Sequence, residues 1–151
     1  MTILATEIVG KQLERLRTAL ESADLPADDI ELPGRTFFEF TLNGTTVGWG
    51  GFETYEADGL LRSIIVDPAH RSKGVGVSLL QLIELKAAEL GVTRLHLLTT
   101  NASGFFEQQG YEVRQRGSEP PMISQTEQFR DLCPGSAVYL CKRICKAVSD
   151  R

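Results

Sequence analysis

The stretch from Leu60 to Leu80, LLRSIIVDPAHRSKGVGVSLL, is the part of the chain that most restricts its fold. An apolar segment rich in β-branched residues ends at Asp67-Pro68, a basic loop with two glycines follows, and an apolar helix begins. The first N–H groups of a helix have no partner within it, and the helix dipole adds partial positive charge there. This order of strand, loop and helix predicts a site that binds a pyrophosphate through backbone N–H groups.

The spacing within the loop is Arg71-x-x-Gly74-x-Gly76. It lacks the third glycine of the dinucleotide-binding fingerprint and the Gly-Lys-Ser/Thr triplet of the P-loop, so neither of these classes is expected. Arg71 and Lys73 add two full positive charges beside the glycines. On these residues alone an alternative stays open: a basic turn whose glycines only allow tight packing.

A second motif follows the predicted strand 95–99. Residues 99–112 read TTNASGFFEQQGYE, in which Ala102, Phe105 and Phe106 give a short helix an apolar side. Gly110 suits the left-handed conformation that often ends a helix. Residues 111–114 alternate as expected of a half-buried strand. The alternative interpretation of this segment is an ordinary core helix followed by a strand.

Together the two motifs resemble those of the GNAT superfamily of N-acetyltransferases, in sequence order and separation. The resemblance covers about residues 35–145 in outline and is sharp in 60–80 and 99–112. It implies a single mixed α/β domain over residues 1–151, with a central, mostly antiparallel, twisted sheet of six or seven strands flanked by helices. It also implies acetyl-CoA as co-substrate, its pyrophosphate on the loop amides and its pantetheine arm along the preceding strand. The residues expected to bind it are Ile64, Ile65, Val66, Arg71, Ser72, Lys73, Gly74, Val75, Gly76, Val77, Ser78 and Phe105.

The remaining periodicity predicts the other elements. Strands are expected at 2–5, 35–42, 45–56, 60–66, 95–99 and 137–144, and helices at 8–23, at 77–90 and within 116–134. Asn43-Gly44 and Asp58-Gly59 are typical of hairpin turns. The helix 77–90 has a predicted core face of Leu79, Leu80, Ile83, Ala87 and Leu90, and residues 24–34 read as a loop.

Composition narrows the function further. A net charge of −4 argues against nucleic acid as the main partner. No apolar run is long enough to span a bilayer, and the first residues lack the features of a signal peptide. Three cysteines without a secretory signal indicate a reduced, cytoplasmic protein. No metal site is expected, and an edge strand near the C-terminus is compatible with a homodimer.

Acetyl transfer requires a polarised thioester carbonyl, a deprotonated amine and a proton for the leaving thiolate. The resemblance implies that a backbone N–H near Val66 polarises the carbonyl. Glu53, on the strand before the cofactor strand, is the first candidate for the general base, and Glu39 is the second. Glu39 is also a candidate for binding the substrate. Arg62 is expected to bind an anionic group of the substrate. The alternatives are solvated glutamates and a rim salt bridge for Arg62.

Two departures from the family pattern concern catalysis. Many GNAT enzymes carry a tyrosine at the position of Phe106, whose hydroxyl protonates the leaving thiolate, and many carry asparagine at Thr99. Tyr111 is taken as the candidate acid, and the other candidates are Ser103, Cys133, Tyr139 or a water. His96 lies in an apolar strand and is expected to be a buried, hydrogen-bonded histidine.

Residues 127–137, EQFRDLCPGSA, resemble the tail of small GNAT proteins encoded with arsenic-resistance genes. This resemblance implies acetylation of a small amino-acid-like toxin, such as an arsenic- or phosphorus-containing glutamate analogue. Three alternatives remain: a peptide or protein acceptor, a non-catalytic module that binds acetyl-CoA, and direct binding of arsenic(III) by Cys133, Cys141 and Cys145.

Overall fold

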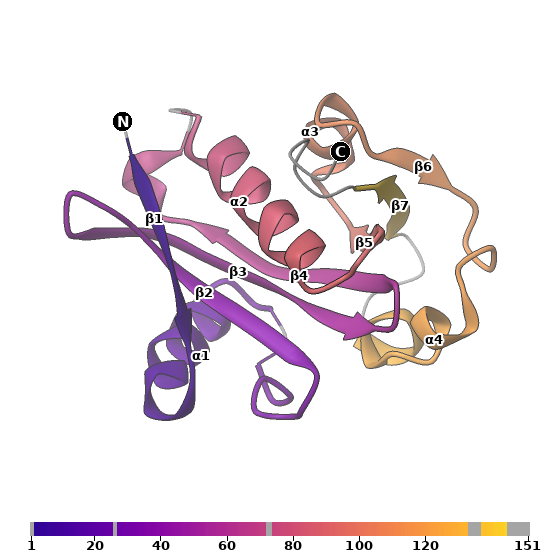
Figure 1. Ribbon diagram of the computed structural model, residues 1–151, viewed down its shortest axis with the longest axis horizontal. Coiled ribbons are helices and arrows are strands. Elements are labelled where there is room, and N and C mark those ends of the chain that lie inside the picture. The colour runs from indigo at the N-terminus through magenta and orange to yellow at the C-terminus, as the bar shows by residue number, and fades with distance from the viewer. Residues whose placement is uncertain (1, 26, 72–73, 133–136, 145–151) are drawn as a thin grey trace. The chain divides into compact units, whose positions relative to one another are not determined.

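The structure is a computed structural model that describes residues 2–25, 27–71, 74–132 and 137–144 (Figure 1). The described elements are, in chain order, β1 (Ile3–Ile8), α1 (Leu13–Ser22), β2 (Arg35–Leu42), β3 (Thr45–Tyr55), β4 (Asp58–Val66), α2 (Val75–Glu89), β5 (Arg94–Thr99), α3 (Ser103–Gln108), β6 (Glu112–Arg114), α4 (Pro121–Ser124) and β7 (Val138–Arg143). Short 3₁₀ turns occupy Gly10–Gln12 and Pro68–His70, and a π-helical turn occupies Gln128–Leu132.

Within the described residues the strands form one seven-stranded sheet in the order β1-β2-β3-β4-β5-β7-β6. β4 and β5 pair in parallel at 58–60 and 94–96, whereas the β1–β2, β2–β3, β5–β7 and β6–β7 pairs are antiparallel. The predicted mixed α/β fold with a mostly antiparallel sheet is therefore confirmed. The chain divides into two compact units, residues 1–53 with 61–86 (unit 1) and 54–60 with 87–151 (unit 2).

Unit 1 is built on β1, β2 and most of β3 and β4, with α1 and α2 on opposite faces of these strands (Figure 1). α1 buries Leu13, Leu16 and Leu20 in a cluster against which Trp49 of β3 packs. The opposite face of β3 is glycine-rich. A Cβ at Gly48 would overlap the carbonyl oxygen of Ile65 and lie 2.7 Å from Leu79 of α2. The absence of a side chain at Gly48 therefore lets α2 pack closely on β3 and β4.

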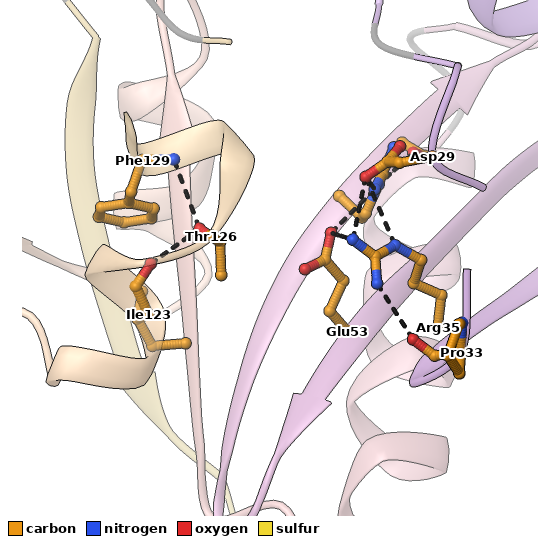
Figure 2. A network of polar contacts seen from close by, with 9 residues as sticks. Asp29, Pro33, Arg35, Glu53, Ile123, Thr126 and Phe129 are labelled. Atoms are coloured by element: carbon orange, nitrogen blue, oxygen red, sulfur yellow. Dashed lines mark hydrogen bonds and ion pairs between the residues drawn. The ribbon is translucent and has the colours of Figure 1, made fainter. Parts of the chain in front are cut away.

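Unit 2 is built on β5, β7 and β6. Its apolar cluster joins Leu60, Ile123, Phe129, Tyr139 and Cys141. Ile123 lies in α4, and the following turn is closed by Thr126, whose hydroxyl donates to the carbonyl of Ile123 at 2.7 Å (Figure 2). The segment that contains α4 therefore packs apolar side chains against the strands, as expected of the helix predicted within residues 116–134.

Several local predictions are confirmed. Asn43 and Gly44 have φ values of 53° and 81°, as a two-residue hairpin turn with two left-handed residues requires. α2 buries Leu79, Leu80, Ile83 and Ala87. Gly91, with φ of 94°, follows the end of this helix.

Two predicted element boundaries are wrong because strand pairing decides them. The helix expected from Ile8 begins at Leu13, because Ile8 pairs with Phe37 at the end of β1 and Gly10 takes a left-handed conformation. The second hairpin turn falls at residues 56–57, because Asp58 already pairs with Arg94 in the sheet.

Exposure also departs from expectation at two positions. Leu90 is 58% exposed because α2 ends before it, and Val113 is 51% exposed on β6. β6, and not the C-terminal β7, is one edge of the described sheet, and β1 is the other edge. No helix in the described ranges is both long and apolar enough to cross a bilayer.

Candidate active site

The loop after β4 leads into the N-terminus of α2, where the first backbone N–H groups have no acceptor within the helix. The Asp67 side chain accepts from the N–H of Ala69 at 3.1 Å and fixes the start of the 3₁₀ turn. Gly74 takes φ of 76° with open space where a side chain would lie, and the N–H of Ser78 donates to its carbonyl at 3.2 Å. Because α2 begins at Val75, the N–H groups of residues 75–77 have no acceptor within the helix. They form a cradle suited to an anion.

The predicted cofactor residues of this loop come together in unit 1. Arg71 is exposed, and its Nε donates to the carbonyl of Val66 at 3.2 Å, so its side chain lies at the end of β4. Val75 is buried, whereas Gly76, Val77 and Ser78 are partly exposed in the first turns of α2. Ser72 and Lys73 lie outside the described residues.

β4 is distorted just before the predicted cofactor strand. Ser63 has φ of 63°, a left-handed conformation that is rare for a residue other than glycine in a strand. Its hydroxyl accepts from Nε of Arg62 at 3.0 Å. The three following residues, Ile64, Ile65 and Val66, are partly exposed, and the N–H of Asp67 returns to the β3 carbonyl of Val47 at 2.8 Å.

Arg62 and Glu53, predicted separately, meet in a buried ionic cluster. Nη1 of Arg62 lies 2.6 Å from Oδ2 of Asp29 and 2.8 Å from Oε2 of Glu53. Arg35 joins the same oxygens at 3.1 Å and 3.6 Å and donates to the carbonyl of Pro33 at 3.1 Å. Figure 2 shows Asp29, Arg35 and Glu53 turned toward one another. Two cations thus balance two carboxylates and hold the loop before β2 on the strands.

The charged side chains of this cluster are buried. The side chain of Arg62 is fully buried, and those of Glu53 and Asp29 are 3% and 5% exposed. Burial alone would raise the pKa of Asp29, but the hydrogen bonds and charges of Arg62 and Arg35 outweigh it and lower that pKa. Burial likewise would lower the pKa of Arg62, but Asp29 and Glu53 raise it. Among the described residues, the other oxygen of Asp29, Oδ1, is buried without a hydrogen-bond partner.

The other predicted site residues have partners outside this cluster. Glu39 on β2 pairs with Arg15 at 2.9 Å and accepts from the hydroxyl of Thr46. In unit 2, Tyr111 is buried with its ring edge-on to Phe106 at 5.5 Å, and Nζ of Lys142 lies 5.4 Å from its centroid.

The remaining residues of the second motif support the short helix α3. Phe105 is partly buried, and its ring lies edge-on to Phe106 at 5.1 Å. The hydroxyl of Thr99, where many relatives carry asparagine, accepts from the N–H of Ala102 at 3.1 Å. Thr99 thus fixes the turn into α3 through its side-chain oxygen.

The sequence interpretation missed Asp29 and Arg35 as members of the ionic cluster. Asp29 was one of several acids in a predicted loop, and nothing in its local sequence sets it apart. Arg35 had one usable signal: it is directly opposite Glu53 in the β2–β3 register, where opposite charges stabilise a sheet. The hairpin at Asn43-Gly44 does not fix this register by itself, because the β2–β3 register shifts by one residue between Phe40 and Thr41.

Comparison with known proteins identifies the family. The model of the acetyltransferase (GNAT) domain matches residues 33–113, more than half of the chain. An uncharacterized N-acetyltransferase of Chlorobaculum tepidum is 32% identical over 90 residues, which is 59% of this chain and 57% of that protein. The chain belongs to the GNAT acetyltransferase family, which agrees with the expected acyltransferase class. The match spans little more than half the length of that relative.

Solved structures agree on the fold. The N-acetylglutamate synthase of Neisseria gonorrhoeae, solved with coenzyme A and N-acetyl-glutamate, has a TM-score of 0.78 at 18% identity, over 97% of this chain and 36% of that chain. The ribosomal-protein-S18-alanine N-acetyltransferase of Escherichia coli has a TM-score of 0.64 at 14% identity, over 99% of both chains. At these identities the likeness concerns the fold alone.

Proposed function

We propose that the chain is an acetyl-CoA-dependent N-acetyltransferase whose acceptor is a small amino-acid-like amine with an anionic group. The observation that carries the proposal is the anion cradle after β4: Gly74 with φ of 76°, open space around it, and the first N–H groups of α2. Such a cradle suits the pyrophosphate of acetyl-CoA. Arg71 adds a full charge beside it, and Ile64, Ile65 and Val66 provide the strand along which the pantetheine arm would lie.

In this reaction the amine nitrogen attacks the thioester carbon, the C–N bond forms and the C–S bond breaks. The ammonium proton must leave first, and the thiolate must gain a proton. Tyr111 remains the proposed acid in place of the missing tyrosine at Phe106. Glu53 remains a proposed base, although its carboxylate already binds Arg62 at 2.8 Å. Arg62 would bind an acceptor anion directly only after exchanging Asp29 for it, and Glu39 stays a proposed substrate contact.

The proposed nature of the acceptor is based on the sequence near the C-terminus. The tail resembling arsenic-resistance proteins favours an arsenical or phosphinic glutamate analogue in a detoxification role. The synthase from Neisseria gonorrhoeae was solved with an acetylated amino acid, which is compatible with such an acceptor. The Escherichia coli enzyme, named for a protein acceptor, has the same fold, so the fold does not select between these classes. The acceptor class and a cytoplasmic location therefore remain parts of the proposal.

Binding of acetyl-CoA tests the loop assignment. Gly76→Val and Arg71→Glu are expected to weaken acetyl-CoA binding in calorimetry at least tenfold, about 1.4 kcal/mol or more. Lys11→Glu is the matched control, because it makes the same charge change at an exposed site of unit 1 outside the loop. Unchanged affinity in both loop variants would overturn the assignment.

A further inference from the structure

Unit 2 contains a cavity of about 780 Å³ whose floor is one face of the strands β5, β7 and β6. Strand register places Arg94 directly opposite Arg143, and residues two apart along a strand share a face. The strand residues of this floor are Arg94, Tyr139, Cys141, Arg143, Glu112 and Arg114. Residues 118–121, which lead into α4, form one wall. Every described residue of the lining belongs to unit 2, so the cavity is a feature of that unit alone.

The charges that line the cavity are predominantly positive. The basic residues of the described lining outnumber the acidic ones: they are Arg94, Arg114, Lys142 and Arg143, against Glu112 and Glu119. Both carboxylates already have partners. Glu112 pairs with Arg114 at 2.9 Å, and Oε1 of Glu119 accepts from the N–H of Gly117 at 2.8 Å. The cavity therefore has an excess of positive charge.

This excess centres on one pair of arginines. Arg94 and Arg143 are like charges directly opposite each other, an arrangement that destabilises a sheet. Oδ1 of Asp58 lies 3.1 Å from Nε of Arg94 and compensates that charge. Arg143 is exposed and forms no ion pair with any residue that the structure describes. An oxyanion held between the two guanidinium groups would remove the repulsion and accept charge-assisted hydrogen bonds from both.

A chain of buried hydrogen bonds positions Arg94. Oδ1 of Asp58 also lies 2.8 Å from Nε2 of His96, and Nδ1 of His96 lies 2.7 Å from the hydroxyl of Tyr139. Burial lowers the pKa of His96, so its imidazole is neutral at pH 7. A carboxylate only accepts, so Nε2 carries the imidazole proton and Nδ1 accepts the proton of Tyr139.

The expectation that His96 is buried and hydrogen-bonded is thus confirmed, because its ring is fully buried between these two partners. The network gives Asp58 a fixed place, and Asp58 in turn holds the guanidinium of Arg94. A side chain that is already ordered loses less conformational entropy when it binds a ligand. Arg94 is therefore better prepared to bind an anion than a freely moving surface arginine.

We propose that this cavity binds a small organic molecule that carries a carboxylate or phosphate group. Arg94 and Arg143 hold the oxyanion, and the rest of the molecule lies against the ring of Tyr139 and against Pro120 and Pro121. The cavity is far larger than an isolated oxyanion requires, and its volume is typical of sites for small molecules. The proposal concerns unit 2 alone and does not depend on acetyl transfer.

Three compounds that share a phenyl ring test the charge that the cavity selects: phenyl phosphate, phenylacetate and phenethylammonium. Calorimetry at constant ionic strength is expected to show saturable binding of at least one of the two anions and none of the cation. Binding of phenyl phosphate alone supports a phosphate ligand, and binding of phenylacetate alone supports a carboxylate ligand. Binding of the cation as tightly as the anions, or no binding of either anion, would overturn the proposal.

The arginine pair is tested with Arg143→Gln and Arg94→Gln, which each remove one guanidinium and keep a polar side chain. Each is expected to weaken anion binding about tenfold or more, because charge-assisted hydrogen bonds are lost. Arg130→Gln is the matched control, since it makes the same charge change at an exposed residue of unit 2 outside the described lining.

Thermal unfolding shows whether each of these variants is folded. Arg143 is exposed, so Arg143→Gln remains informative if the loss of Arg94 disturbs the buried network. Anion affinity that is the same in wild type and in folded Arg143→Gln would overturn the site.

The loop after β4, in unit 1, also suits anions, and Arg71→Glu separates the two sites. Anion affinity is expected to be unchanged in Arg71→Glu and to fall in Arg143→Gln. The opposite result would assign the anion to the loop and overturn the proposal. Neither acetyl-CoA nor turnover enters these measurements, so failure of the proposed function leaves this test intact. Failure of the cavity test likewise leaves the proposed function unaffected.

Discussion

At the residue scale, Arg62 has the largest predicted effect on stability. Its guanidinium is fully buried between Asp29 and Glu53, so Arg62→Met leaves two carboxylates without their main partner. The free energy of unfolding is expected to fall by about 3–5 kcal/mol in urea denaturation. Arg15→Met is the control: Arg15 is 64% exposed in its ion pair with Glu39, and its loss should cost less than about 1 kcal/mol. Equal losses would show that burial of the cluster is unimportant.

Asp29 gives the cluster a defined dependence on pH. Its folded pKa lies below the unfolded value of about 3.9, so the ionised carboxylate stabilises the fold above about pH 4. That contribution is lost as the pH falls through the folded pKa. Asp29→Asn should therefore be less stable at neutral pH and lose less further stability on acidification below pH 4. Parallel acid-unfolding curves for wild type and variant, followed by circular dichroism, would contradict this.

The limits of prediction at this scale are visible in Arg62 itself. Alternation along its strand predicted an inward-facing arginine and left two roles open, an anion ligand or a salt bridge. Its ion-pair partner Asp29 lies 33 residues away in the sequence, in a loop. Such a pair follows from tertiary packing, which neither residue's local sequence encodes. His96 was more predictable, because its neighbours on β5 are apolar and a buried imidazole needs partners.

At the element scale, the approach of α2 to β3 and β4 depends on Gly48. A Cβ there would meet the Ile65 carbonyl and lie 2.7 Å from Leu79. Gly48→Ala is expected to destabilise by about 1–3 kcal/mol through overpacking. Gly104→Ala, in α3 with open space around it, should instead be neutral or slightly stabilising. Thermal unfolding of the two variants checks the contrast, and similar midpoints would contradict close packing at Gly48.

Elements with strong local signals were predictable, and their boundaries less so. Asn43-Gly44 places two left-handed residues between alternating strands, so β2 and its turn were found directly. The start of α1 was missed because apolar periodicity from Ile8 onward fits a helix as well as the strand end it forms. Asp58-Gly59 is a favoured turn dipeptide, but it lies in β4 because Asp58 pairs with Arg94. That pairing spans 36 residues, and the local sequence does not show it.

At the scale of the whole molecule, the two sequence motifs predicted the family fold, and the order of strands and helices along the chain agreed with it. The sheet order β5-β7-β6 was not predictable from that pattern, because it depends on long-range pairing. The acceptor is a separate matter. Structures with this fold include enzymes named for an amino acid and for a ribosomal protein, so the substrate must be argued from side chains and not from the fold.

The central claim is catalysis of N-acetylation, and product formation tests it most directly. The protein would be incubated with acetyl-CoA and, separately, with L-glutamate, phosphinothricin, putrescine and a short peptide, and products would be detected by mass spectrometry. We expect an acetylated product from an anionic amino acid, and its loss in Arg71→Glu but not in Lys11→Glu. Acetyl-CoA that binds yet stays intact with every amine would contradict the claim and indicate a binding module, in keeping with Phe106 where a proton-donating tyrosine is common.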